Sequence, residues 1–168
     1  MIKIVGLGPG AKEALTIGTL ELLKSDCKVL FRTEKHPNVE YLKSLGVTFE
    51  SYDYMYEKFN SFDDVYNSIA VDIIEEYSQC NNIVYAVPGH PLVAEKSVTL
   101  LIKYCDEKNI PYEIIPAVSF IDAVMETLKL DPIDGIKIID AFDIKNQILD
   151  KRVGLIITQV YNQLIASE

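Results

Sequence analysis

The chain has 168 residues, of which 49% are hydrophobic and 24% are charged, a composition typical of a globular protein. Twenty-five acidic residues against sixteen basic ones give a formal net charge of −9. This charge is the opposite of the positive field that binds a phosphate backbone, so nucleic acid is not an expected partner. No stretch approaches the roughly eighteen apolar residues of a membrane span, and no signal peptide is recognised. We therefore expect a cytoplasmic protein without a membrane partner.

Apolar runs typical of strands alternate along the chain with segments whose apolar residues recur at helical spacing. Residues 2–7 form an apolar run, interrupted by Lys3, that stops at a glycine-rich turn, as expected of a strand buried on both faces. In chain order, the sequence predicts strands at residues 2–7, 28–31, 47–51, 83–87, 112–115, 136–139 and 153–158, and helices near residues 16–25, 38–46, 61–77, 98–105, 119–128 and 144–149.

Capping signals support the predicted helices. Thr16 is a plausible N-cap of the first helix, and Asn38 is expected to cap the second. Ser61 with Asp64 resembles a capping box, in which side chains three residues apart bind the free amides of a helix start, and Ser119 begins the same spacing. These signals place the helix starts directly after loops.

Several other residues have structural interpretations. Three tyrosines alternate as at a strand edge and are interpreted as packing residues: Tyr52, Tyr54 and Tyr56. Four basic residues near loop ends are interpreted as solvated charges, with a small basic rim as the alternative: Arg32, Lys35, His36 and Lys96. Three widely spaced cysteines without a C-x-x-C motif favour reduced structural residues over a metal or redox site: Cys27, Cys80 and Cys105.

The alternation of strands and helices predicts an α/β fold with a largely parallel sheet and helices on both faces. Pro116 is a reasonable boundary between an N-terminal α/β lobe, residues 1–115, and a partial C-terminal α/β lobe, residues 116–168. The second lobe holds few residues and is expected to be truncated. Ligands of such sheets bind beyond the carboxyl ends of the strands, so the loops after strands are the candidate site.

Three stiff loops rich in small residues follow predicted strands, namely residues 6–11, 88–94 and 116–120. Their glycines let the backbone approach a ligand, and their prolines restrict the backbone. The first loop also fits the dinucleotide fingerprint, but Pro9-Gly10 and the delayed helix disagree with the geometry of that site. A P-loop is excluded because Gly-Lys-Ser and Gly-Lys-Thr are missing.

In order and wording, the loops resemble those of the tetrapyrrole (corrin and porphyrin) methylase family: Gly-x-Gly-Pro-Gly, then Gly-Asp-Pro, then Pro-Gly-x-Ser-Ser. The resemblance implies a two-lobed α/β protein, commonly a homodimer, that binds S-adenosylmethionine between its lobes. The second loop, Pro-Gly-His-Pro-Leu-Val-Ala-Glu, looks most like the methylase-like domain fused ahead of a MazG-type nucleotide pyrophosphohydrolase.

The resemblance also implies the cofactor-binding residues, which are Pro9, Gly89, His90, Val93, Ser119, Phe120 and Gln159. Three positions depart from the family pattern. His90 stands where the family has aspartate, Ala117 replaces a glycine, and Phe120 replaces a serine.

Methyl transfer from a sulfonium is an in-line displacement, for which the protein mainly positions two partners. No catalytic residue is therefore assigned, and no metal is expected. His90 is expected to bond its own loop, with a proton-accepting role as the alternative. Glu95 is expected to be a first-turn charge of the next helix rather than a base.

Two functional hypotheses follow. The first is a methyltransferase domain of the tetrapyrrole methylase type that uses S-adenosylmethionine and acts on an unidentified small molecule. The second is a catalytically inactive methylase-like module that binds a small molecule or regulates a fused MazG-type domain. The hydrolase chemistry itself is not expected here, because the sequence lacks paired helical carboxylates for magnesium.

Overall fold

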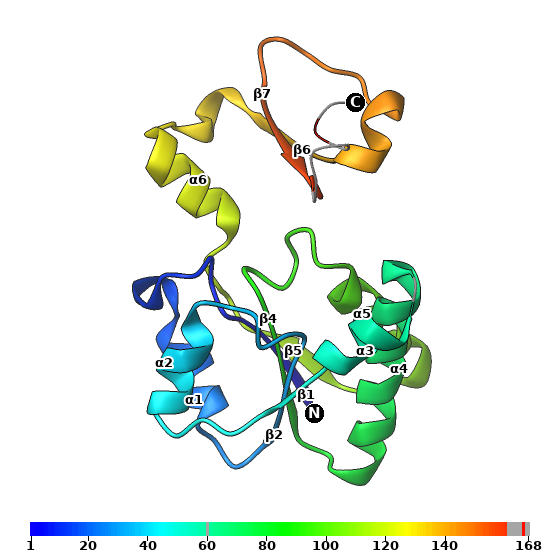
Figure 1. Ribbon diagram of the computed structural model, residues 1–168. Helices are drawn as coiled ribbons and strands as arrows, with labels where there is room; N and C mark the ends of the chain where they lie inside the picture. The colour runs from blue at the N-terminus through cyan, green and yellow to red at the C-terminus, as the bar shows by residue number, and fades with distance from the viewer. Residues whose placement is uncertain (60, 161–165, 167–168) are drawn as a thin grey trace. The chain divides into compact units, whose positions relative to one another are not determined.

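The computed structural model describes residues 1–59, 61–160 and 166. They pack as two compact units, Met1–Ala123 and Val124–Glu168 (Figure 1). The first unit contains the three loops identified in the sequence. The division of the sequence at Pro116 stays a prediction.

A five-stranded parallel sheet forms the centre of the first unit, with strand order β3-β2-β4-β1-β5. Both faces of the central strands are buried, which explains their largely apolar sequence. The strands are β1 (Ile2–Gly6), β2 (Lys28–Phe31), β3 (Glu50–Ser51), β4 (Ile83–Val87) and β5 (Tyr112–Ile114). This arrangement confirms the predicted α/β class.

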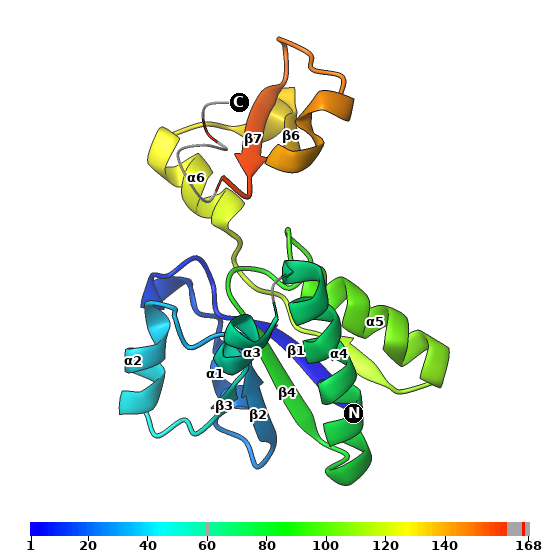
Figure 2. The same cartoon turned by 45° about the vertical axis from the view of Figure 1, so that its right-hand side comes forward.

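Helices cover both faces of this sheet (Figures 1 and 2). One apolar cluster joins the strands to α1 (Ile17–Leu23) and α2 (Asn38–Ser44). On the opposite face, a second cluster joins them to α3 (Asp53–Lys58), α4 (Phe62–Gln79) and α5 (Lys96–Lys108). The two clusters hold the strand ends in a fixed position, and the loops that follow them begin from a rigid frame.

The second unit is built around a two-stranded parallel sheet of β6 (Ile136–Asp140) and β7 (Gly154–Thr158). The 3-10 helices η2 (Pro132–Asp134) and η3 (Ala141–Asn146) connect its elements, whereas η1 (Lys12–Ala14) belongs to the first unit. Helix α6 (Phe120–Leu128) begins in the first unit and ends in the second.

Two predicted caps are confirmed, because Thr16 Oγ1 accepts a hydrogen bond from Thr19 N at 3.2 Å and Ser61 Oγ accepts one from Asp64 N at 3.2 Å. The cap at Asn38 is wrong. Asn38 is the first helical residue of α2, and its side-chain amide donates to Leu7 O at 2.8 Å instead of capping the helix.

The strand-edge interpretation of the tyrosines is also wrong, because Tyr54 and Tyr56 lie in α3 and Tyr52 directly precedes it. Tyr52 and Met55 are buried and lie three residues apart, as on one face of a helix. The alternation of tyrosines over residues 52–56 suggested the spacing of a strand instead. The predicted strand at residues 47–51 is reduced to Glu50–Ser51. Among the described residues, the helices are too short or too polar to traverse a bilayer.

Candidate functional site

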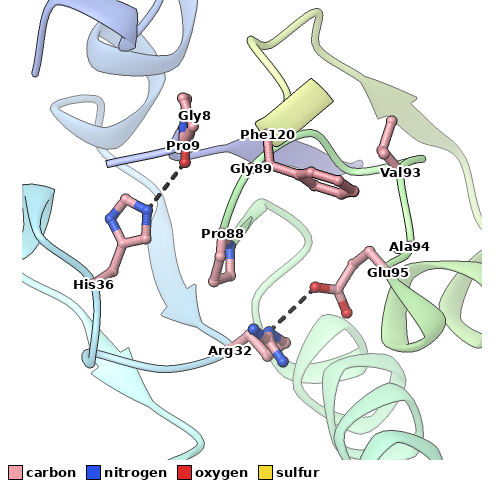
Figure 3. Close-up of a pocket in the computed structure, with 10 residues that line it drawn as sticks. All are labelled: Gly8, Pro9, Arg32, His36, Pro88, Gly89, Val93, Ala94, Glu95 and Phe120. Atoms are coloured by element: carbon pink, nitrogen blue, oxygen red, sulfur yellow. Dashed lines mark hydrogen bonds and ion pairs between the residues drawn. The ribbon is translucent and has the colours of Figure 1, made fainter. Parts of the chain in front are cut away.

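A cavity of about 250 Å³ lies in the first unit, where β1, β2 and β4 end (Figure 3). Parallel strands bring their carboxyl ends to one edge, so loops distant in sequence meet there. The residues that line it are Gly8, Pro9, Arg32, His36, Pro88, Gly89, Val93, Ala94, Glu95 and Phe120.

The first two loops are joined by backbone hydrogen bonds. Gly8 N donates to Gly89 O at 3.2 Å, and Gly89 N donates to Gly8 O at 2.9 Å. Gly6, at the end of β1, lies so close to the other loops that a Cβ there would collide with Gly89 O and lie 2.6 Å from Ala117 Cβ. The first two loops therefore meet through backbone atoms, the third approaches Gly6 with the Ala117 side chain, and glycine is required at the junction.

Helix α2 holds the first loop from the other side. His36 Nδ1 accepts from Asn38 N at 3.2 Å, which leaves the proton on Nε2 to be donated to Gly8 O at 3.0 Å. Burial lowers the pKa of His36, with a smaller contribution in the same direction from the Arg32 charge, against the effect of the Gly8 bond. His36 is therefore a neutral support of the loop at pH 7.

The second loop runs from β4 to α5. Gly89 has a φ of +66°, and a Cβ built on it would contact no atom within 4 Å, so the backbone faces open space beside the cavity. His90 Nδ1 accepts a hydrogen bond from Leu92 N at 3.0 Å, which confirms the expectation that it bonds its own loop. Ala94 adopts a φ of 53° before the chain enters α5.

The third loop ends in a capping box. Ser119 Oγ accepts from Ile121 N at 3.1 Å, and the Asp122 carboxylate accepts from Ser119 N at 2.7 Å and Ser119 Oγ at 2.8 Å. The backbone bond from Ser119 is the largest cause of the lowered pKa of Asp122. This local network orients the start of α6 and places Phe120 at the cavity.

A charged pair completes the lining. Arg32 Nε lies 3.2 Å from Glu95 Oε2, and only 19% of the Arg32 side chain and 6% of the Glu95 side chain are exposed. Burial, the largest single influence, lowers the pKa of Arg32, but the negative charge of Glu95 together with smaller contributions from nearby tyrosines outweighs it, and the net shift of the pKa is upward. The interpretation of Arg32 as a solvated surface charge is therefore wrong, as is the placement of Glu95 within a helical turn, because it is the N-cap of α5.

Four of the residues expected at a cofactor site line the cavity, namely Pro9, Gly89, Val93 and Phe120. His90 and Ser119 shape the second and third loops through the bonds described above. Gln159 follows β7 in the second unit, with a φ of 64°. The cofactor contacts of all seven residues stay predictions.

The preferred interpretations from the sequence placed Arg32, His36 and Glu95 outside the site, although the alternative of a small basic rim included Arg32 and His36. Two features of the sequence could have placed Arg32 and Glu95 at the site. Arg32 directly follows the apolar residues 29–31 of β2, and Glu95 lies between the second loop and a helix. Within residues 1–59, 61–160 and 166, no three potential ligands cluster as a metal site would require.

The profile of the family described as Tetrapyrrole (Corrin/Porphyrin) Methylases matches residues 1–164. The protein YabN of Bacillus subtilis (strain 168) is 41% identical over 167 residues, which are 99% of this chain and 34% of YabN. The chain thus spans about a third of the length of this relative.

Solved structures share the fold at low identity. Uroporphyrin-III C-methyltransferase of Thermus thermophilus has a TM-score of 0.68 at 18% identity, covering 93% of this chain and 66% of that one. A complex of that enzyme with S-adenosylhomocysteine has a TM-score of 0.58 at 17% identity, covering 83% and 55%. Diphthine synthase has a TM-score of 0.59 at 18% identity, covering 83% and 54%. By its sequence, this chain belongs to the tetrapyrrole (corrin/porphyrin) methylase family.

Proposed function

We propose that the chain is a methyltransferase domain that binds S-adenosylmethionine and methylates a small-molecule acceptor. The observation that carries the proposal is the convergence of the Gly8, Gly89 and Phe120 segments on one cavity in a member of this family. A solved relative in complex with S-adenosylhomocysteine adds support. Four of the residues named from the family resemblance line that cavity.

The residues present fit such a cofactor. The cavity of about 250 Å³ is somewhat smaller than a typical ligand pocket of roughly 300–1,000 Å³, so it accommodates part of a nucleoside-sized molecule. The open space at Gly89 gives access to backbone groups, and Val93 with Phe120 offers apolar surface for a base or a thioether.

The bound cofactor would supply an activated methyl group. The task of this chain is then to position the two reactants and exclude water. The bridged Gly8 and Gly89 backbones give a fixed wall, Val93 and Phe120 keep part of the cavity apolar, and Arg32 with Glu95 gives it one charged end.

Calorimetric titration with S-adenosylhomocysteine tests the proposal. We expect binding by the natural sequence and a loss of roughly tenfold in affinity for Phe120→Ala, because an apolar wall is removed. Phe142→Ala is the matched control, since Phe142 is 69% exposed and lies in the second unit. Absence of binding by the folded natural sequence would contradict the proposal.

A second candidate is an inactive methylase-like module that senses a small molecule beside a fused MazG-type domain. It is favoured by His90 at the family's aspartate position and by the match to only a third of YabN. A folded chain that binds no S-adenosylhomocysteine, or binds it without transferring a methyl group in any tested mixture, supports this candidate. The expected homodimer is a separate prediction, checked by light scattering after size-exclusion chromatography.

A further inference from the structure

The Arg32 guanidinium is incompletely bonded at the cavity. Nη1 donates to Tyr56 Oη at 3.1 Å. Nε is fully buried and near Glu95 Oε2, but its N–H direction does not give a hydrogen bond. A guanidinium has five N–H groups, and burying them without acceptors costs free energy. Among the described residues, the four N–H groups of the two Nη atoms have one side-chain acceptor, Tyr56 Oη. These groups, rather than the buried Nε, can donate to a ligand in the cavity that Arg32 lines (Figure 3).

Glu95, in contrast, is well satisfied by its own helix. Its Oε1 accepts from Ser97 N at 3.3 Å and from Ser97 Oγ at 2.7 Å. Since the Ser97 hydroxyl proton is used in this way, Tyr85 Oη donates to Ser97 Oγ at 2.7 Å. Glu95 is also the N-cap of α5, where the helix dipole favours a negative charge. The carboxylate is thus fixed at α5.

The two charges of the pair are therefore unequally compensated. Among the residues that the structure describes, the carboxylate is stabilised by a helix start and two hydrogen bonds, whereas the guanidinium has one hydrogen bond and one poorly directed ion pair. Buried ion pairs contribute little net free energy to stability, because the cost of desolvating the two charges offsets much of their attraction. A role in binding explains the under-bonded cation better. The other ionisable residue of the lining, His36, is neutral at pH 7.

We propose that Arg32 is a specificity-determining residue that binds an oxyanion, a carboxylate or a phosphate, on the ligand of this cavity. The inference deepens the proposed function and rests on it for the identity of the cavity as the reaction site. Guanidinium donors match both anions in a planar, two-pronged geometry. The chain has a net charge of −9, which disfavours anionic ligands overall, whereas the Arg32 cation favours them locally at the cavity.

The chain contains two arginines, so nitrogen-15 NMR of the arginine Nε–Hε groups tests the proposal directly. Arg152, with 87% of its side chain exposed and paired to Asp150, serves as the internal control. Succinate and inorganic phosphate are the anionic probes, and succinamide is the uncharged probe. We expect succinate, phosphate or both to shift the Arg32 signal saturably. Succinamide should not shift the Arg32 signal, and the anions should not shift the Arg152 signal in the same way.

A shift with succinate identifies a carboxylate as the group that Arg32 binds, and a shift with inorganic phosphate identifies a phosphate. The proposal is overturned if neither anion shifts the Arg32 signal, if succinamide shifts it equally, or if Arg152 responds with the same concentration dependence. A failure of the proposed function gives a different pattern, in which S-adenosylhomocysteine does not bind but the Arg32 signal still responds to anions.

Variants give a second readout. Arg32→Gln alone leaves the Glu95 charge buried and unpaired, so the informative protein is the double variant Arg32→Gln with Glu95→Gln. We expect it to fold, by circular dichroism, and to lose roughly tenfold to a hundredfold in anion affinity. Arg152→Gln should leave the affinity unchanged. A folded double variant that binds the anion as tightly as the natural sequence contradicts the proposal.

Discussion

The two units differ sharply in how much of their apolar surface they bury. Of the buried apolar residues among those described, all but Ile139 lie in Met1–Ala123. The second unit exposes large apolar side chains such as Ile133 and Ile148. Helix α6 and strands β6 and β7 are as apolar in sequence as elements of the first unit, so apolar sequence alone does not determine burial. Burial requires elements that cover both faces of a sheet, as in the first unit.

A pair of leucine substitutions gives the largest expected effect. Leu101 is fully buried in α5, whereas Leu128 in α6 is 59% exposed. Leu101→Ala should lower the free energy of unfolding by about 2–5 kcal/mol, because it removes apolar contacts and leaves a cavity. Leu128→Ala should change it by less than about 0.5 kcal/mol.

Urea unfolding measures both values. Tyrosine fluorescence follows the first unit, since nine of the ten tyrosines lie there and the chain has no tryptophan. Circular dichroism follows the whole chain. A loss for Leu128→Ala comparable with that for Leu101→Ala would show that Leu128 is covered in solution and would remove the contrast between the units.

Glycine-to-alanine substitutions compare the units at their backbones. Gly6→Ala forces a Cβ against Gly89 O and Ala117, so we expect a loss of about 1–3 kcal/mol in unfolding free energy and weaker ligand binding. Gly154, also at a strand end, has only an ordinary contact, 3.6 Å to Gly135 O. Gly154→Ala should therefore have little effect. Equal losses in urea unfolding would contradict the close approach described at Gly6.

The smallest effect is a pH dependence located at His36. Its pKa is lowered in the folded protein, chiefly by burial, so the unfolded chain binds the proton more readily. Stability from the neutral form is present above the unfolded pKa of about 6.5 and is lost as pH falls towards the folded pKa. His36→Gln should flatten this part of the stability curve, measured by urea unfolding between about pH 7 and pH 5. Parallel curves for the two proteins would show that His36 is not the group responsible.

The meeting of the three loops was predictable from the sequence, because parallel strands bring their carboxyl ends to one edge. The Arg32–Glu95 pair was not, since it depends on strand order. Arg32 N donates to Ala86 O at 2.9 Å, which continues the pairing of β2 with β4. This pairing brings Arg32, after β2, close to Glu95, which follows β4. Local patterns carry no information on which strands are neighbours.

Local signals were reliable where the side chain acts on its own segment, as at Thr16 and Ser61. They failed at Asn38, whose amide binds Leu7 O in a distant loop. They also failed around Tyr52, because a strand edge and a short helix give the same pattern over five residues. Tertiary contacts decided both cases.

The paired amides and carbonyls of Gly8 and Gly89 have a consequence for engineering this scaffold. The frame of the cavity is made of main-chain atoms, whereas Val93, Phe120 and Arg32 project side chains from it. Exchanging Val93 or Phe120 changes the shape of the cavity without rebuilding the frame, whereas Arg32 must be exchanged together with Glu95 so that no buried charge is left unpaired. New ligand preferences can therefore be sought in small combinatorial libraries at these positions, with the two glycines held constant.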